Sequence, residues 1–87
     1  MRFEYDPDKS RSNAEKHGID FDAAQQLWED PWLLRAPART DDEPCFIVVG
    51  RIGEKHWVAV CVERAGTVRI ISVRRARKTE VERYEGK

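Results

Sequence analysis

The segment RIISVRRARK, residues 69–78, holds five basic residues and no acid in a protein whose formal net charge is zero. Arg64 precedes it, so the stretch 64–78 contains six basic residues and no acidic one. All but Lys78 are arginines, whose planar guanidinium groups bind phosphate through paired hydrogen bonds. The pattern predicts a phosphate-binding surface of the kind that nucleic-acid recognition needs. The alternative is that these arginines form ion pairs with acids in the first half of the chain.

Two groups in the sequence are candidates for the base that RNA cleavage without a metal requires. Such cleavage also needs cations to hold the phosphate and an acid for the leaving oxygen. His17 follows Lys16 at the end of an expected helix, where its alternative role is to cap the last carbonyl groups. Glu63 is the second candidate, a carboxylate that ends an apolar strand beside Arg64. Tyr84 is expected to pack in the core, although its hydroxyl is able to reach a basic surface.

Composition and charge distribution limit the class of protein. The 87 residues, of which 40% are hydrophobic and 37% charged, are typical of a single soluble globular domain. Residues 1–44 carry 6 Lys/Arg against 11 Asp/Glu, whereas residues 45–87 carry 10 against 5. This division favours either a basic surface or mutual neutralisation of the two halves. No apolar run approaches the roughly 20 residues that span a bilayer, and the start lacks a signal-peptide profile, so we expect a cytoplasmic protein.

Neither a metal nor a cofactor is expected. Cys45 and Cys61 lie in apolar runs and are predicted to be small buried hydrophobic residues. Together with His17 and His56 they lack the spacing of a zinc site. The sequence also contains no Walker loop, GxGxxG, HExxH or GxSxG motif. Any chemistry must therefore come from the side chains alone.

The elements that position these side chains are indicated by helix caps and turns. Asp6-Pro7 predicts the start of a helix that ends at Gly18, and this helix is nearly all polar. Asp20 predicts the start of a second helix, which ends before Pro31 and buries an apolar stripe. A last helix is predicted to begin at a capping box of Thr79 and Glu82.

Strands are predicted at 3–5, 32–36, 45–52, 56–63 and 67–74, with a polar loop at 38–44. The order β-α-α-β-β-β-β-α predicts an α+β domain with an antiparallel sheet, two N-terminal helices and one C-terminal helix. Strict alternation along the last strand places Arg69 and Arg75 on one face and Arg74 on the other.

Several stretches together resemble the BrnT family, the toxin components of bacterial type II toxin–antitoxin pairs. The matching segments, which cover nearly the whole chain, are FEYDPDKSRSNAEKHGIDFDAA, TDDEPCFIVVGR and VERAGTVRIISVRRARKTEVERYE. The KHG-x2-F pattern from Lys16 to Phe21 and the RIIS-x-R-x-A pattern from Arg69 to Ala76 are fairly specific in combination. The chain departs from the family at Arg39-Thr40, where relatives often carry a His-Ser pair.

The resemblance implies a RelE-like ribonuclease fold and an RNA-cleaving toxin that blocks translation. It also implies a BrnA-type ribbon-helix-helix antitoxin, whose complex with the toxin binds operator DNA and represses their shared operon. Carried over by match, the expected catalytic residues are His17, Glu63, Arg64, Arg69 and Arg74, with substrate-binding roles for Lys16 and Tyr84. Arg75 and Arg77 of the basic segment are also expected to bind substrate. The alternative function is a non-catalytic basic module that binds a partner protein or operator DNA.

Overall fold

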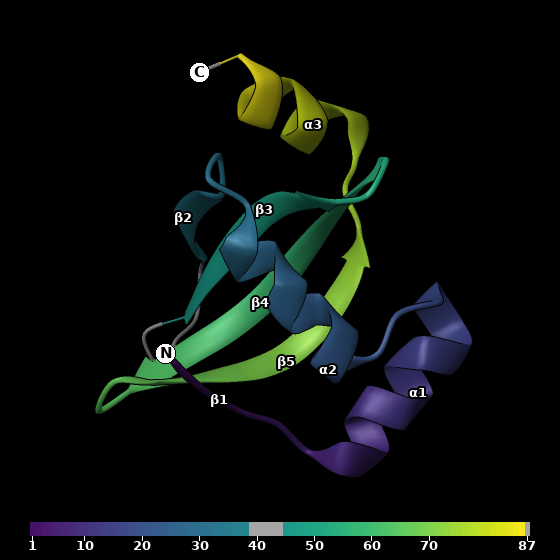
Figure 1. Cartoon of the computed structure of the whole chain (residues 1–87), viewed down its shortest axis with the longest axis vertical. Coiled ribbons are helices and arrows are strands. Elements are labelled where there is room, and N and C mark those ends of the chain that lie inside the picture. The colour runs from purple at the N-terminus through teal and green to yellow at the C-terminus, as the bar shows by residue number, and fades with distance from the viewer. Residues whose placement is uncertain (39–44, 87) are drawn as a thin grey trace.

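The computed structural model describes residues 1–38 and 45–86, and its elements follow the predicted order (Figure 1). In chain order they are β1 (Arg2–Glu4), α1 (Pro7–His17), α2 (Phe21–Ala24), the 3-10 helix η1 (Gln25–Glu29), β2 (Leu34–Ala38), β3 (Cys45–Ile52), β4 (Lys55–Arg64), β5 (Thr67–Arg75) and α3 (Lys78–Glu85). The α+β class is therefore confirmed. β2 begins two residues later than predicted. Beyond Ala38, the predicted polar loop lies outside the described residues.

The strands form one sheet in the order β1-β5-β4-β3-β2. Strands β2 to β5 make the predicted antiparallel meander. β1 instead pairs parallel with β5, from Arg2 opposite Thr67 to Glu4 opposite Arg69. The sheet is thus mixed, and the prediction of antiparallel pairing is wrong at this edge. The reason is that the apolar pattern of so short a strand does not encode the direction of its pairing, which α1 and α2 determine by their path.

Helix α1 begins and ends at the predicted residues. The Asp6 carboxylate accepts a hydrogen bond from the Asp8 amide at 2.9 Å, and Pro7 occupies the first turn. At the other end Gly18 has a φ of 80°, a left-handed conformation that favours glycine, and its amide donates to the Ala14 carbonyl at 2.9 Å. The cap signals alone were sufficient to locate both ends.

Two buried polar side chains explain how a nearly all-polar helix packs. Asn13, only 7% exposed, donates to the Ile19 carbonyl at 2.8 Å and accepts from the Val73 amide at 3.2 Å. Ser10 accepts from the Phe21 amide at 2.9 Å. These bonds satisfy backbone groups at the end of α1, at the start of α2 and on β5. Helix α1 is therefore held against β5 by hydrogen bonds where other helices use an apolar stripe.

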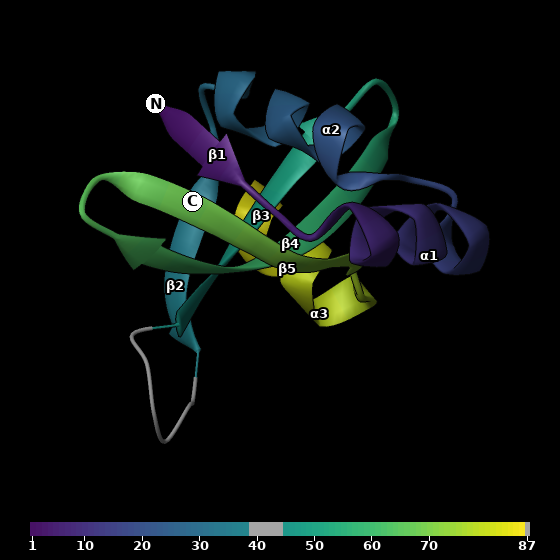
Figure 2. The ribbon, with the colours of Figure 1, turned by 90° about the horizontal axis from the view of Figure 1, so that it is seen from below.

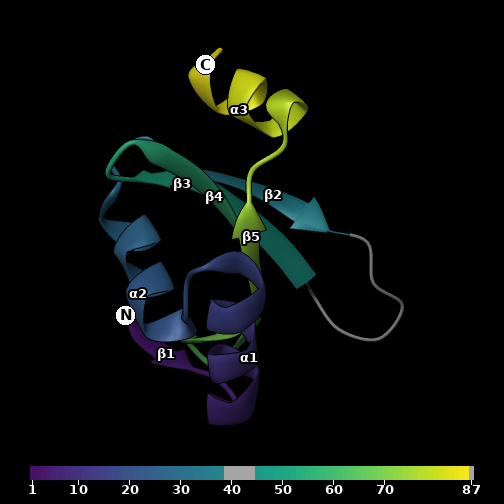
Figure 3. The same ribbon diagram turned by 90° about the vertical axis from the view of Figure 1, so that its right-hand side faces the viewer.

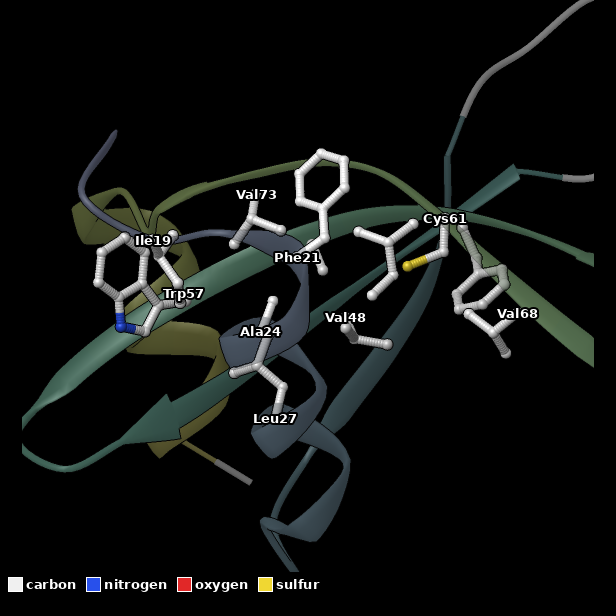
Figure 4. Close-up of a cluster of buried hydrophobic side chains, with 12 residues drawn as sticks. Ile19, Phe21, Ala24, Leu27, Val48, Trp57, Cys61, Val68 and Val73 are labelled. Carbon is white, nitrogen blue, oxygen red and sulfur yellow. The ribbon is translucent and has the colours of Figure 1, made fainter. Parts of the chain in front are cut away.

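The first face of the sheet is covered by α2 and η1 and carries the main core (Figure 4). The Asp20 side chain caps α2 as predicted, accepting from the Ala23 amide at 2.7 Å. The core consists of Ile19, Phe21, Ala24, Leu27, Phe46, Val48, Trp57, Ala59, Cys61, Val68, Ile70 and Val73. Burial raises the pKa of Cys61 to about 12, so its thiol stays protonated at neutral pH, as expected of a packing residue.

The second face is covered by α3, on the side of the sheet opposite to α2 (Figure 2). Tyr84 of α3 packs on Val49 and Val58. The helix begins earlier than predicted, because the Glu80 carboxylate, and not that of Glu82, accepts from the Arg77 amide, at 2.7 Å. The predicted capping box of Thr79 and Glu82 is therefore wrong. No helix among the described residues is long and apolar enough to cross a membrane.

Candidate functional site

An irregularity in the pairing of β4 and β5 decides which arginines share a face. The register shifts between Val60 and Cys61, so that Ser72 lies opposite Val60 while Ile70 lies opposite Cys61. The residue between them, Ile71, is extra and is 38% exposed. A bulge of this kind reverses the alternation beyond it, and it brings Arg69, Ser72 and Arg74 to the second face. The prediction of strict alternation, with Arg69 and Arg75 together, is wrong for this reason.

A basic hollow of about 290 Å³ lies between α1 and β5. Figure 3 shows α1 running along the edge of the sheet at this strand. The lining residues are Lys9, Ser12, Asn13, Lys16, His17, Phe21, Ile71 and Ser72. Three of them are lysine or histidine, and none is acidic. The hollow therefore combines cations, two hydroxyl groups and one exposed apolar side chain, a set that fits a phosphate with an attached base.

The structure places His17 and Lys16 together in this hollow, both with exposed side chains. The alternative role of His17 was to cap the last carbonyls of α1. The Ala14 carbonyl instead accepts a hydrogen bond from the Gly18 amide. Asn13 fixes the position of α1 on β5 through its bond to the Val73 amide, next to Ser72. The relative positions of α1 and the strand that carries Ser72 thus depend on a buried hydrogen bond.

Sequence reasoning missed Lys9, Ser12, Ser72 and Ile71. Lys9, Ser12 and Lys16 are spaced by three and four residues on α1, so they share one helical stripe. This spacing was enough to predict their common helix face once the helix boundaries were known. The exposure of Ile71 beside them could not be predicted, because it depends on the bulge.

Arg74 has a structural partner. Its guanidinium donates two hydrogen bonds to the Glu80 carboxylate, each of 2.8 Å, and the two side chains are 25% and 17% exposed. The hydrogen bond from Arg74 is the main reason that the pKa of Glu80 is lowered to about 2. The first residues of α3 are thereby tied to the end of β5. Arg77, exposed, occupies the N-cap position of that helix. The acidic partner of Arg74 comes from α3, and not from the first half of the chain.

Arg69 and Arg64 lie at the other end of the same strand pair. Arg69 is half exposed and its guanidinium is 3.6 Å from the Glu4 carboxylate of β1, a longer ion pair than that of Arg74. Arg64 lies on β4 opposite Thr67, and Thr67 precedes Arg69 by two residues on β5. Arg69 therefore does contact the acidic first half, but through a loose pair that leaves much of its side chain exposed to solvent.

Two other predicted residues, Glu63 and Arg75, lie away from the hollow. Glu63 lies opposite Val68, on the first face, and its carboxylate accepts from Arg35 at 3.1 Å. Arg75 extends on the same face, with its guanidinium carbon 5.4 Å from the centre of the Trp57 ring. The structure does not bring these groups together with His17.

Tyr84 is a core residue, as first expected. Its hydroxyl donates to the Asp30 carboxylate at 2.6 Å. Burial, followed by that bond to a carboxylate, raises the pKa of Tyr84 to about 12. The same Asp30 side chain accepts from the amides of Trp32 and Arg51. The tyrosine thus links α3 to the turn after η1 and to β3.

The described residues contain no group of three or more His, Cys, Asp and Glu side chains suited to holding a metal ion. The departure at Arg39-Thr40 lies outside the described residues.

The fold is that of a small α+β domain, and its hollow between α1 and β5 gathers two lysines and a histidine. The family follows from comparison with known proteins. Residues 5–80 match the family described as "Ribonuclease toxin, BrnT, of type II toxin-antitoxin system". The chain therefore belongs to the BrnT family, as its resemblance predicted, and membership in a type II toxin–antitoxin family implies an antitoxin as partner. The comparison with curated proteins gave no match.

Proposed function

We propose that the protein is a cytoplasmic endoribonuclease that needs no metal and cleaves RNA in the hollow between α1 and β5. The observation that carries the proposal is the grouping of His17, Lys16, Lys9 and Ser72 around one exposed apolar side chain, Ile71. A catalytic role for His17 fits this grouping better than one for Glu63. Glu63 lies on the first face of the sheet, opposite to the face of Ser72, and already pairs with Arg35.

The chemistry follows from the groups in the hollow. His17 takes the proton of a ribose 2′-hydroxyl, and the 2′-oxygen then forms a bond to the adjacent phosphorus. The bond from phosphorus to the 5′-oxygen breaks, and that oxygen takes a proton from Lys16 or from water. The products are a 2′,3′-cyclic phosphate and a 5′-hydroxyl end. Lys9 and Lys16 stabilise the charge that develops on the phosphate oxygens in the transition state.

Binding of the substrate extends beyond the reacting phosphate. Ile71 offers an apolar contact for a base, and the Ser12 and Ser72 hydroxyl groups are hydrogen-bond donors for phosphate. Arg69 precedes Ser72 on the same face of β5, and it is assigned the binding of a neighbouring phosphate. Arg64 is assigned the same role. Arg74 is not, because its guanidinium is used on Glu80.

Independence from metals is proposed because the described lining of the hollow supplies cations and no carboxylate, whereas a magnesium site needs oxygen ligands. The experiment uses the purified chain, separated from its antitoxin by denaturation and refolding, and labelled RNA in EDTA. We expect cleavage in EDTA that added Mg²⁺ does not increase. Cleavage that appears only with Mg²⁺ would contradict the proposal. RNA that binds but stays intact in both conditions would favour the non-catalytic alternative.

The antitoxin is proposed to be of the BrnA type, with a ribbon-helix-helix domain through which the complex binds operator DNA and represses the operon. The chain would contact DNA only through that complex. The simplest inhibitor of a basic hollow fills it with carboxylates, so the contacting segment is expected to be acidic. Protection of the Lys9 and Lys16 side chains from acetylation in the complex would support this arrangement. Equal acetylation of both lysines with and without antitoxin would contradict it.

A further inference from the structure

A second hollow, of about 410 Å³, lies beside the edge strand β2 and is separate from the one that contains His17. It is lined by Arg35, Ala36, Pro37, Cys45, Phe46 and Glu63. Glu63 is paired with Val68, which precedes Ser72 by four residues on β5. Glu63 and Ser72 therefore belong to different parts of the strand pair, and the two hollows share no lining residue among those described. Different nucleotides can occupy them.

The floor of this hollow is a stacked pair. The guanidinium carbon of Arg35 lies 3.7 Å from the centre of the Phe46 ring, while the Phe46 side chain is buried beneath it. The Arg35 side chain nevertheless remains 57% exposed. The phenyl ring lies against the cation, and more than half of the Arg35 side chain is open to solvent. Guanidinium planes held in this way are surfaces on which single-stranded bases stack.

A carboxylate lies at the edge of the stacked pair. Glu63 Oε1 accepts from Arg35 Nη2 at 3.1 Å, and this side chain is 42% exposed. A carboxylate has about four acceptor positions, and within the described residues only Arg35 is hydrogen-bonded to this one. Glu63 and Arg35 line the same hollow, and both side chains are partly open to solvent. A base stacked there would present its hydrogen-bonding edge to a pure acceptor.

We propose that Arg35, Phe46 and Glu63 form a binding site for a guanine base of RNA. Guanine alone among the four bases offers two adjacent N–H donors, N1–H and the N2 amine, that fit the two oxygens of a carboxylate. Adenine and cytosine offer one amine beside an acceptor nitrogen, which a carboxylate repels. The site rests on the proposed function only in that RNA is the polymer expected to deliver the base.

The test measures binding of nucleoside monophosphates that share one phosphate and differ in the base. Backbone amide shifts of the isotope-labelled chain are followed by NMR during titration with GMP, IMP and AMP. IMP keeps N1–H but lacks the N2 amine, so it isolates one of the two hydrogen bonds. We expect shifts at the Arg35, Phe46 and Glu63 amides, and affinity for GMP roughly fivefold or more above that for AMP, with IMP between them.

Two variants with matched controls complete the test. Glu63→Gln should abolish the preference for GMP over AMP, whereas Glu54→Gln, in the exposed β3–β4 turn, should retain it. Arg35→Lys should weaken all three ligands alike, because the charge stays but the planar surface is lost. Arg75→Lys, at the other stacked arginine, should leave binding unchanged.

Equal affinity for GMP and AMP, or a preference that survives Glu63→Gln, would overturn the inference. Shifts confined to residues around Lys9 and His17 would also overturn it, because the phosphate alone would then account for binding. Since the readout is binding of a mononucleotide, its failure leaves the cleavage of RNA in EDTA to be judged separately.

Discussion

Replacement of Arg74 with alanine should destabilise the protein, because this arginine holds α3 onto β5. The pKa of Glu80 is lowered from 4.5 to about 2. At 1.36 kcal/mol per pKa unit, this corresponds to an upper limit of about 3 kcal/mol for the interactions of the ionised carboxylate. Glu80 keeps the hydrogen bond from the Arg77 amide in the variant, so the expected loss is about 2 kcal/mol. For a domain of this size the melting temperature should fall by about 10 °C at pH 7.

The pH dependence gives the sign of the effect. The pKa of Glu80 is lower in the folded state than in the unfolded state. Its stabilising contribution is therefore fully present above about pH 4.5 and is lost as the pH falls towards 2. Urea denaturation of the wild type and of Arg74→Ala, at several pH values between 7 and 2, measures the difference. We expect the two curves of unfolding free energy against pH to converge at the acid end.

A matched control is the removal of an arginine from an exposed ion pair. Arg11 lies 2.9 Å from Asp8, and both side chains are largely in solvent. Arg11→Ala should change the free energy of unfolding by less than about 0.5 kcal/mol. An Arg74→Ala variant as stable as Arg11→Ala at pH 7, or a deficit that persists unchanged at pH 2, would refute the structural role assigned to Arg74.

Three further predictions concern the contacts around the site. Asn13→Ala should cost about 2–4 kcal/mol of stability, because two buried backbone groups lose their hydrogen-bond partner. It should also accelerate hydrogen exchange of the Val73 amide, and unchanged exchange there would contradict the hydrogen bond from that amide to Asn13. Tyr84→Phe should cost about 1–2 kcal/mol in urea denaturation, through loss of the bond to Asp30, and a neutral result would mean that the bond contributes nothing net. Arg69→Ala should slow RNA cleavage about tenfold or more, since it removes a charge-assisted phosphate contact. Its melting temperature should stay within a few degrees of the wild type, and a large fall would show that the pair with Glu4 is structural instead.

Much of the fold was predictable because its boundaries are set by local chemistry. Asp6, Pro7 and Gly18 define α1 through hydrogen bonds made within a few residues. The long apolar run at 45–52 coincides with β3, since no other element accommodates such a run next to a tight turn. The direction of β1 was not predictable, because it depends on where two helices lead the chain.

The site was only partly predictable, because its geometry depends on long-range contacts. His17 and Lys16 were identified from their position at a helix end, and both line the hollow. The bulge at Ile71 depends on the register of β4 against β5, which a pattern of alternating residues cannot reveal. It regroups the arginines, and Arg74 forms its paired hydrogen bonds with Glu80 on the second face. A run of arginines in the sequence thus contains residues with different contacts.

The most direct test of the account is single-turnover cleavage of RNA in EDTA by His17→Gln, compared with His56→Gln. A general base contributes roughly 100-fold or more to such a reaction, so His17→Gln should be slower by at least about that factor while its melting temperature is unchanged. His56 packs against Tyr84 beneath α3, away from the hollow, and its replacement should leave the rate within about twofold, less than the general-base effect. Cleavage by His17→Gln at the wild-type rate would contradict the placement of the catalytic site between α1 and β5.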